Sequence, residues 1–195
     1  IDSNKKLVFN YSGHGTVFSI GTFTTNDVVF SADDIGEWVY IAVTVSFPEK
    51  TVKFYKNNVS YLNTGSGTLD TKIANKTAPF VVGGYLLNTS PGYFDGEICE
   101  VRIWNTIRTE EEIIENYNKE LLGTEEGLQG YWKLNNNYLD ETSNNNDLTA
   151  VNDPIFIKDS PFLLSFTSSS NLKKILSSSF TSNSNLITNI YSLDL

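Results

Sequence analysis

Short stretches in which apolar and polar residues alternate recur along most of the chain and predict β-strands. Residues 6–11 and 16–20 form the first two, on either side of a Gly-His-Gly turn, and a shorter stretch follows at 28–30. In EWVYIAVTV, which begins at Glu37, both sets of alternate positions are largely apolar. A strand that is apolar on both faces is typical of a central position in a sandwich. The pattern therefore predicts an all-β chain.

Turn residues separate the later strand patterns. The pair Asn57-Asn58 in KFYKNNVSY suits a tight hairpin turn with positive φ angles. The double glycine Gly83-Gly84 in APFVVGGYLL indicates a bulge or the close approach of another backbone. GLQGYW, which starts at Gly127, resumes the strand pattern late in the chain, and PIFI follows it. Tight turns between short strands favour antiparallel pairing.

One segment departs from the period of two. After a turn, EICEVRIW alternates as a strand, and Thr109 to Glu112 then form a capping box, in which a hydroxyl and a carboxylate each accept from a backbone amide. Three glutamates in the first turn also suit the positive end of a helix dipole. The apolar residues that follow at helical spacing are Ile113, Ile114, Tyr117 and Leu121. With Gly123 placed to end the helix in a left-handed conformation, the pattern predicts one short helix near 109–122.

The charge balance excludes some partners. The chain carries 23 acidic and 14 basic residues, a net charge of −9, and its densest basic pairs are Lys5-Lys6 and Lys173-Lys174. Binding to phosphates needs clustered Lys and Arg, so no nucleic-acid partner is expected. No apolar run approaches the roughly 18–20 residues of a membrane span. Asn, Ser and Thr number 22, 20 and 19, which predicts a polar but largely uncharged surface.

Five stretches together resemble a known family. They are EWVYIAVTV, VKFYKNN, FVVGGY, FDGEICEVRIWNTIRTEEEIIENYN and GLQGYWKLNN. In this order they resemble the laminin-G-like and pentraxin-like members of the concanavalin A-type jelly rolls, in which a strand runs straight into a short helix. The resemblance spans residues 7–157 and is most specific from Phe94 to Ile114. It implies an antiparallel two-sheet jelly-roll sandwich with one short α-helix.

The resemblance also implies a division of the chain. The family's first strands lack counterparts before Leu7, so residues 1–158 are expected to form an N-terminally incomplete jelly roll. The chain contains no Met, and we expect that Ile1 is not a native translation start. Residues 159–195, rich in Ser, Asn and Leu, are expected to form a partly β tail that docks on a partner or belongs to a second repeat opened by the GLQGYW stretch.

No catalytic constellation is expected. Some relatives with this fold hydrolyse polysaccharides, which needs two carboxylates flanking the scissile bond. Here the nearest pair is Glu97 and Glu100, whose spacing of three places them on opposite faces of a strand. The single cysteine, Cys99, lies in the same strand pattern and is expected to be a small buried hydrophobe. The single histidine, His14, lies in a glycine turn. We therefore expect the protein not to be an enzyme.

The pentraxin calcium site is not matched. Its acidic loop corresponds here to Tyr85, Leu86 and Leu87, which cannot supply the hard oxygen ligands that calcium takes. The family's aspartate before Glu100 is likewise replaced by cysteine. Two other acidic clusters occur, one at Asp33, Asp34 and Glu37 and one at Asp140, Glu141 and Asp147. We expect solvated turns at both places and no cofactor, with Asp33 and Asp34 as the candidate ligands if calcium binds.

A sugar-binding loop is the leading hypothesis for a site. Sugar sites pair an aromatic face with neutral hydrogen-bonding groups, and the chain has ten Tyr, three Trp and many Asn. The candidate ligand-binding residues, which bracket one loop, are Tyr85, Asn88, Tyr93 and Asp95. The alternative is that the two tyrosines pack in the core or at its rim. The three tryptophans, which lie within strand patterns, are expected in the core: Trp38, Trp104 and Trp132.

The resemblance implies a non-catalytic recognition module of a secreted or surface protein, with a glycan as the first expected ligand and a surface protein as the next. The alternative is a structural repeat in a surface filament, a capsid or another large extracellular assembly, which self-associates or exchanges strands between subunits. A toxin's receptor-binding part is a third alternative. Four Asn-X-Ser/Thr sequons occur, as many as chance gives, and Asn75 and Asn88 are the expected acceptors if the source is eukaryotic and secretory.

Overall fold

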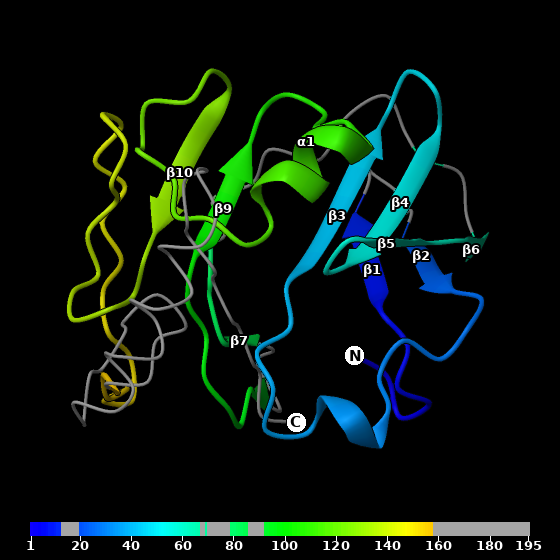
Figure 1. Ribbon diagram of the computed structural model, residues 1–195, viewed down its shortest axis with the longest axis horizontal. Coiled ribbons are helices and arrows are strands. Elements are labelled where there is room, and N and C mark those ends of the chain that lie inside the picture. The colour runs from blue at the N-terminus through cyan, green and yellow to red at the C-terminus, as the bar shows by residue number, and fades with distance from the viewer. Residues whose placement is uncertain (13–19, 67–68, 70–78, 86–91, 158–195) are drawn as a thin grey trace, which may run out of the picture.

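The computed structural model describes residues 1–12, 20–66, 69, 79–85 and 92–157 (Figure 1). Every strand pair in them is antiparallel. The elements are β1 (Val8–Ser12), β2 (Ile20–Thr25), the 3-10 turn η1 (Ala32–Asp34), β3 (Ile41–Ser46), β4 (Thr51–Lys56), β5 (Val59–Tyr61), β6 (Asn63–Ser66), β7 (Gly84–Tyr85), β8 (Gly92–Tyr93), β9 (Val101–Trp104), α1 (Glu110–Asn116) and β10 (Leu128–Trp132). The prediction of an antiparallel β fold with one short helix is confirmed.

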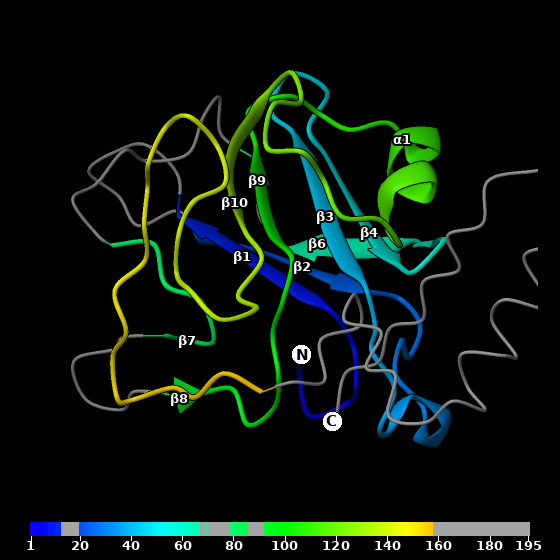
Figure 2. The same ribbon diagram turned by 60° about the vertical axis from the view of Figure 1, so that its left-hand side comes forward.

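Two three-stranded ladders form the first half of the molecule. Their strand orders are β1-β2-β6 and β3-β4-β5. Strands β5 and β6 follow each other with only Leu62 between them, so one extended segment passes from the second ladder to the first (Figures 1 and 2). The core between the ladders takes one face of β4 and side chains from β1–β2 and its flanking loops. Its buried members are Leu7, Phe23, Val29, Phe30, Val52, Phe54 and Leu69.

Packing in this core is tight where β2 meets β6. Phe23 pairs with Gly65 across the two strands. A Cβ added at Gly65 would lie within 2.5 Å of two carbon atoms of the Phe23 ring. Gly65 is therefore required by the phenyl ring that occupies the space of its missing side chain, since cores are packed at crystal density.

The prediction that EWVYIAVTV is a central strand buried on both faces is wrong. Within the described residues, β3 pairs only with β4 and lies at the end of its ladder. Ile41 and Val43 remain 39% and 43% exposed. The strand also begins at Ile41 rather than at Glu37, because the preceding backbone bonds the hairpin end: the amide of Tyr40 donates to Asn57 Oδ1 at 2.9 Å.

Three other predicted strands are also corrected. Residues 28–30 form a loop, and the amides of Val29 and Phe30 both donate to the carbonyl of Lys5 at 3.0 and 3.2 Å. Of residues 79–85, only the last two form a strand, β7. Residues 154–157 contribute no strand to the described ladders. Of the apolar side chains in these segments, Val29 and Phe30 are buried in the core, whereas Ile155 is 84% exposed.

Local turn rules hold better. Asn57 adopts the predicted positive φ, 52°, in the two-residue turn between β4 and β5, although Asn58 does not. Gly83 has a φ of +75°, and a Cβ at Gly84 would lie 3.0 Å from the carbonyl oxygen of Gly92. The predicted close approach of another backbone at the double glycine is therefore confirmed, and it is the β7–β8 pairing that causes it.

The helix starts as predicted and ends early. Thr109 Oγ1 accepts from the Glu112 amide at 3.2 Å, and Glu112 Oε2 accepts from the Thr109 amide at 2.9 Å, which completes the capping box. Helical structure stops at Asn116 instead of continuing to 122. Gly123 has a φ of +85° but caps no helix. Its missing side chain makes room for the carbonyl of Glu141, which a Cβ would meet at 2.3 Å.

The early end has a physical cause. The guanidinium of Arg102 donates to the carbonyl of Asn116 at 2.9 Å and also to that of Lys119. The amide of Leu121 donates to the Tyr131 hydroxyl at 3.1 Å. Side chains of β9 and β10 thus satisfy the backbone groups that a further helical turn would have used. Leu121 is buried as its apolar character suggested, but outside the helix.

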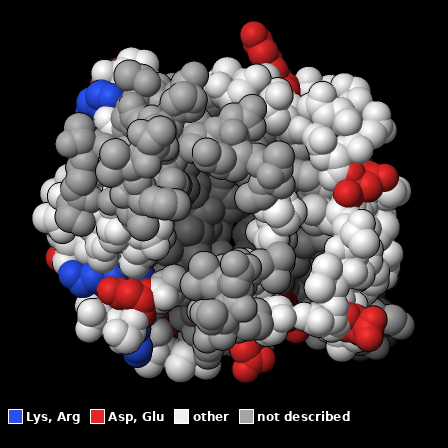
Figure 3. Space-filling model, turned by 180° about the vertical axis from the view of Figure 1, so that it is seen from behind, with Lys and Arg blue, Asp and Glu red and all other residues white. Residues whose placement is uncertain are grey.

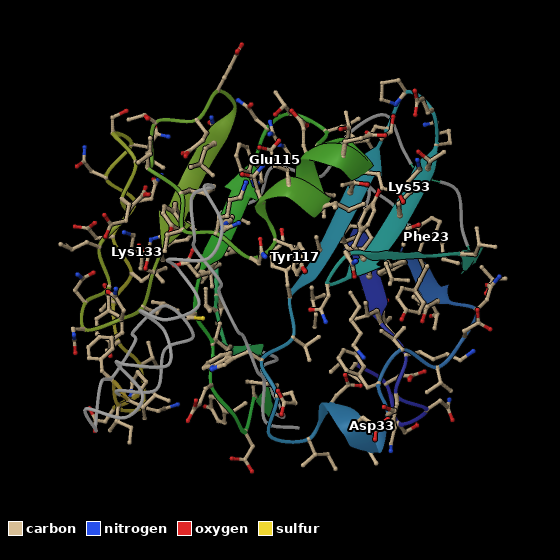
Figure 4. The ribbon with its side chains drawn as sticks, viewed as in Figure 1. Phe23, Asp33, Lys53, Glu115, Tyr117 and Lys133 are labelled. Carbon is tan, nitrogen blue, oxygen red and sulfur yellow. The ribbon has the colours of Figure 1, made fainter. Side chains whose placement is uncertain are left out.

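Helix α1 lies over the outer face of the β3-β4-β5 ladder (Figure 4). The Ser60 hydroxyl donates to Glu110 Oε1 at 3.2 Å, and the rings of Tyr40 and Tyr117 are 6.2 Å apart. Tyr55, the cross-strand partner of Ser60, is only 1% exposed. One face of β4 therefore lies in the core. The other face is covered at Tyr55, whereas Thr51 and Lys53 on that face are exposed.

Candidate functional site

Strands β9 and β10 carry a candidate site in the second half of the molecule. The two strands pair antiparallel, with a register shift between Leu128 and Gly130. The six-membered ring of the Trp132 indole lies over Gly130, where a Cβ would be 2.3 Å from one of its carbon atoms and 2.9 Å from two others. Gly130 pairs with Ile103, whose side chain is 41% exposed. On this face of the pair, Ile103 is exposed and the indole of Trp132 lies buried over the backbone of Gly130.

An open pocket of about 480 Å³ lies on this face. Phe80 reaches it from the segment before β7, and its ring stacks on Trp132 with centroids 5.3 Å apart and an interplanar angle of 27°. Phe80 is 51% exposed, whereas Trp132 is only 4% exposed, so the indole supports the phenyl ring and the phenyl ring faces solvent. The lining residues are Phe80, Ile103, Gln129, Trp132, Asn146, Asp147 and Leu148.

The polar wall of the pocket comes from a loop organised by Asp140. Its Oδ1 accepts from the amides of Tyr131 and Thr142, both at 3.0 Å, and its Oδ2 accepts from the amide of Asn146 at 2.9 Å. Burial favours the neutral carboxyl, but these amide donors outweigh it and hold the pKa of Asp140 below its usual value. A buried anion therefore fixes the path of residues 140–146.

Side-chain amides tie the same loop to β10. Asn144 and Asn146 each donate from Nδ2 to the carbonyl of Gln129, at 3.0 and 3.2 Å. The Trp132 indole N–H donates to the carbonyl of Asn146 at 2.9 Å, and Asp147 Oδ1 accepts from the Asp140 amide at 2.9 Å. The exposed side chains of the wall are thus held in place beside the aromatic pair before any ligand arrives.

The opposite side of β9–β10 is an internal polar network. Glu100 Oε2 accepts from the Tyr131 hydroxyl at 2.6 Å and from Arg102 at 2.8 Å, and the charged side chains are 8% and 5% exposed. Burial raises the pKa of Glu100 above its usual value, against the lowering effect of these two donors. Glu100 adopts a φ of 56°, which is uncommon for a non-glycine residue. This network positions strands and the segment after α1, and it leaves Glu100 inaccessible to a substrate.

Cys99 next to it offers no nucleophile. Its side chain is half-buried, and burial raises the pKa of its thiol to about 12, so it stays protonated at neutral pH. His14, the other half of any Cys–His pair, lies outside the described residues.

The sequence-predicted loop residues lie on the β7–β8 hairpin, below β9 in Figure 2. Tyr85 pairs with Gly92 and Tyr93 pairs with Gly84, so the two tyrosines are not cross-strand partners. Tyr93 is 60% exposed, and Asp95 is also exposed. Asn88 and the glycosylation candidate Asn75 lie outside the described residues. The hairpin therefore stays a predicted binding site.

The first acidic cluster is not the solvated turn that was expected. Asp34 is buried: its Oδ2 accepts from the Ser31 amide at 2.7 Å, and its Oδ1 lies 2.5 Å from Lys56 Nζ. Burial opposes ionisation, but the bonds from Lys56 and Ser31 outweigh it and lower the pKa of Asp34. Asp33 is exposed, as Figure 4 also shows. No group of three or more potential metal ligands occurs among the described residues, and calcium binding at Asp33 and Asp34 stays a prediction.

Sequence reasoning missed the pocket. Only Trp132 of the three tryptophans is fully buried, whereas Trp38 and Trp104 are half-buried and Arg108 lies 4.3 Å over the Trp104 ring.

Phe80 is the aromatic residue of the pocket that faces solvent, and it stacks on Trp132. The available signals were the Asn-rich stretch SNNND after GLQGYW and the aromatic residue ahead of the double glycine. Their meeting in space depends on a contact between residues far apart in the chain.

A family comparison agrees with this architecture. The Laminin_G_3 family model, described as the concanavalin A-like lectin/glucanases superfamily, matches residues 1–114. The chain belongs to this superfamily. The match to the superfamily covers Phe80 and Ile103 and ends within α1, so β10 and the polar loop of the pocket follow it. No curated protein and no solved structure matches the chain.

Other surface features are less distinctive. Among the described residues, no helix is both long and apolar enough to span a bilayer. On the face shown in Figure 3, the charged side chains of the described residues are scattered, and neither sign gathers into a patch. The pocket on β9–β10 therefore remains the feature with the clearest chemical character.

Proposed function

We propose that this superfamily member is a non-catalytic recognition module that binds carbohydrate in the pocket on β9–β10. The observation that carries the proposal is the exposed Phe80 ring, stacked on a buried Trp132 beside a wall of fixed amide and carboxylate groups. Binding sites for small ligands are concave and largely apolar, with a few placed polar groups, and this pocket has both components.

The chemistry of the two walls suits a sugar. A pyranose ring has one face of C–H groups, which packs on an aromatic ring, and an edge of hydroxyls that both donate and accept hydrogen bonds. Here Phe80 supplies the ring, and Gln129, Asn146 and Asp147 supply the polar groups. Because Asp140 already holds the loop in place, little order has to be gained when the ligand binds.

The proposal of binding without hydrolysis rests on the carboxylates. Glycoside hydrolysis needs two carboxyl groups on either side of the bond. Asp147 is the carboxylate among the pocket's lining residues, and Glu100 is engaged in the buried network on the other side of the strand pair. We place the module on a secreted or surface protein, with a glycan as first partner and a surface protein as second.

The proposal is tested by a glycan array with the purified chain, followed by titration of the best ligand into variants. Phe80→Ala is expected to lower affinity at least tenfold, because the stacking face is lost. Tyr93→Ala is the matched control, since it removes an equally exposed aromatic side chain from the predicted hairpin site. An array without any bound glycan would contradict the function, and loss of binding in Tyr93→Ala alone would move the site to the hairpin.

An assembly repeat is the second candidate function, and the end strand β3 favours it. Ile41 and Val43 are exposed on a strand that pairs on only one side within the described ladders. Such an edge can accept a strand from another subunit. Sedimentation of the wild-type chain and of Val43→Lys distinguishes the cases: assembly through this edge predicts oligomers that the charged variant abolishes.

A further inference from the structure

We infer that the pocket on β9–β10 selects uncharged saccharides and binds them without a bridging cation. This inference rests on the proposed carbohydrate function and adds the class of sugar and the mode of recognition. It follows from three properties of the described pocket: the sign of its charge, the hydrogen-bonding atoms that it presents, and the way in which its acidic groups are already used.

The charge of the pocket is negative. Among the described residues that line it, Asp147 is the one that carries a charge, and neither Lys nor Arg occurs among them. The whole chain carries a net charge of −9. A sulfated, sialylated or uronate sugar would bring an anion close to Asp147 with no basic group of the lining to compensate it. Neutral sugars meet no such repulsion.

The polar atoms of the wall suit hydroxyl groups. Asn146 Nδ2 donates one of its two N–H groups to the Gln129 carbonyl, which leaves the second N–H and Oδ1 for a ligand. Asp147 Oδ1 accepts from the Asp140 amide, which leaves Oδ2 as its acceptor. Both residues are exposed, as is Gln129, whose carboxamide adds a donor and an acceptor. The wall thus presents both acceptors and donors, which suits sugar hydroxyls because they donate and accept. Sulfate and carboxylate groups only accept, so they cannot satisfy Asp147 Oδ2.

The acidic loop is held without metal ligation. Three backbone amides donate to the two oxygens of Asp140, and Asp147 Oδ1 accepts from the Asp140 amide. A calcium site would need these same oxygens directed at one cation, together with several others. Backbone amides thus order this loop in the way that a bound cation orders a calcium-binding loop. Asp140 acts as a positioning residue for the polar wall of the pocket.

The size of the pocket fits a short oligosaccharide. Its volume of about 480 Å³ lies within the range of roughly 300–1,000 Å³ that is common for small-ligand sites. Because Trp132 lies at the base of the pocket and stacks on Phe80, binding should change the indole fluorescence.

The test uses the full chain and two panels of trisaccharides. The neutral panel contains cellotriose, maltotriose and chitotriose, and the acidic panel contains trigalacturonic acid and heparin-derived trisaccharides. Tryptophan fluorescence is titrated with and without EDTA. At least one neutral trisaccharide is expected to bind at least tenfold more tightly than either acidic one, with an EDTA effect on Kd below twofold. Phe80→Ala should remove this binding.

Charge variants sharpen the test. Asp147→Asn is expected to weaken neutral binding, because it changes an acceptor of the wall. It should also narrow the ratio between the Kd values of acidic and neutral trisaccharides, because it removes the negative charge. Asp33→Asn removes the same charge from a distant exposed site and should change neither value (Figure 4). Preferential binding of an acidic trisaccharide, or loss of binding in EDTA, overturns the inference while the proposed carbohydrate function stands. The absence of binding by every trisaccharide, together with an empty glycan array, overturns both.

Discussion

The two halves of this molecule, the two three-stranded ladders and the β9–β10 region, differ in the interactions that stabilise each of them. The ladders β1-β2-β6 and β3-β4-β5 enclose an apolar cluster around Phe30 and Phe54, which are 1% and 2% exposed. The β9–β10 half has a smaller buried cluster, made of Leu121, Leu128 and Tyr131. It relies in addition on buried polar side chains, chiefly Asp140, Arg102 and Glu100, that bond backbone groups and each other. In the first half, burial of apolar side chains, which has no preferred direction, stabilises the fold. In the second half, directional hydrogen bonds fix the backbone beside the pocket.

The difference bears on function. Apolar packing tolerates exchange of similar side chains, because total volume and pattern largely decide it. A loop held by three amides on one carboxylate has one geometry and fails if the carboxylate is removed. Fixed geometry is what a binding wall needs, so it is consistent that the pocket lies in the polar half.

The largest expected effect is in the apolar half. Phe54→Ala should destabilise the fold by about 3–5 kcal/mol, because it removes a fully buried ring and leaves a cavity. The measurement is urea unfolding followed by circular dichroism. Val59→Ala, at a 49% exposed position of the adjacent strand, should change the free energy of unfolding by less than about 1 kcal/mol. Similar values for the two variants would contradict the core assignment.

The second-largest effect is expected from breaking the buried ion pair between Glu100 and Arg102, which should lower the free energy of unfolding by about 3 kcal/mol. Arg102→Leu leaves Glu100 charged and buried without its partner, and it frees the carbonyls of Asn116 and Lys119. The double variant Glu100→Gln with Arg102→Leu should recover part of the loss. A double-mutant cycle by urea unfolding gives the coupling energy, and additive effects would show that the pair does not act as a unit.

The polar loop predicts a pH-dependent effect of about 1–3 kcal/mol. Asp140→Asn weakens three amide bonds to one buried group. The folded-state pKa of Asp140 lies below the unfolded value of 3.8, so the carboxylate stabilises the fold above that pH. Its contribution is lost as the pH falls through the folded-state pKa. The stability difference between wild type and variant should therefore be full at pH 7 and vanish in strong acid; a constant difference would contradict this role.

The smallest expected effect is at the helix cap. Thr109→Ala removes one half of the capping box and should cost about 1 kcal/mol. Thermal unfolding measures it as a fall in Tm. Thr149→Ala, which changes an exposed threonine outside the strands and the helix, is the control and should leave Tm unchanged. An equal shift in both variants would mean that the cap does not contribute.

The same contrast explains what could be predicted from sequence. The capping box at Thr109, the turn at Asn57 and the close approach at Gly84 depend on neighbours in the chain, and all three were predicted. The prediction of the helix end was wrong because Arg102 and Tyr131, which lie on other elements, form hydrogen bonds with backbone groups of residues 116–121. Local rules contain no information about such distant partners.

The site was harder to predict for a related reason. The sequence predicted an aromatic loop at Tyr85 and Tyr93, whereas the exposed ring beside the pocket is Phe80, which stacks on Trp132. The alternating pattern marked Trp132 as a core residue, and it is buried. The spacing of the Asn-rich stretch did not indicate that the Asp140 carboxylate is buried and accepts hydrogen bonds from backbone amides.

The segment that runs through Leu62 has a mechanical consequence. Since only Leu62 separates β5 from β6, the last strand of one ladder continues directly into the last strand of the other. Pulling either ladder apart strips a strand from its neighbour, so the two layers should melt in a single cooperative step. The direct link through the exposed Leu62 thus makes the two ladders one folding unit.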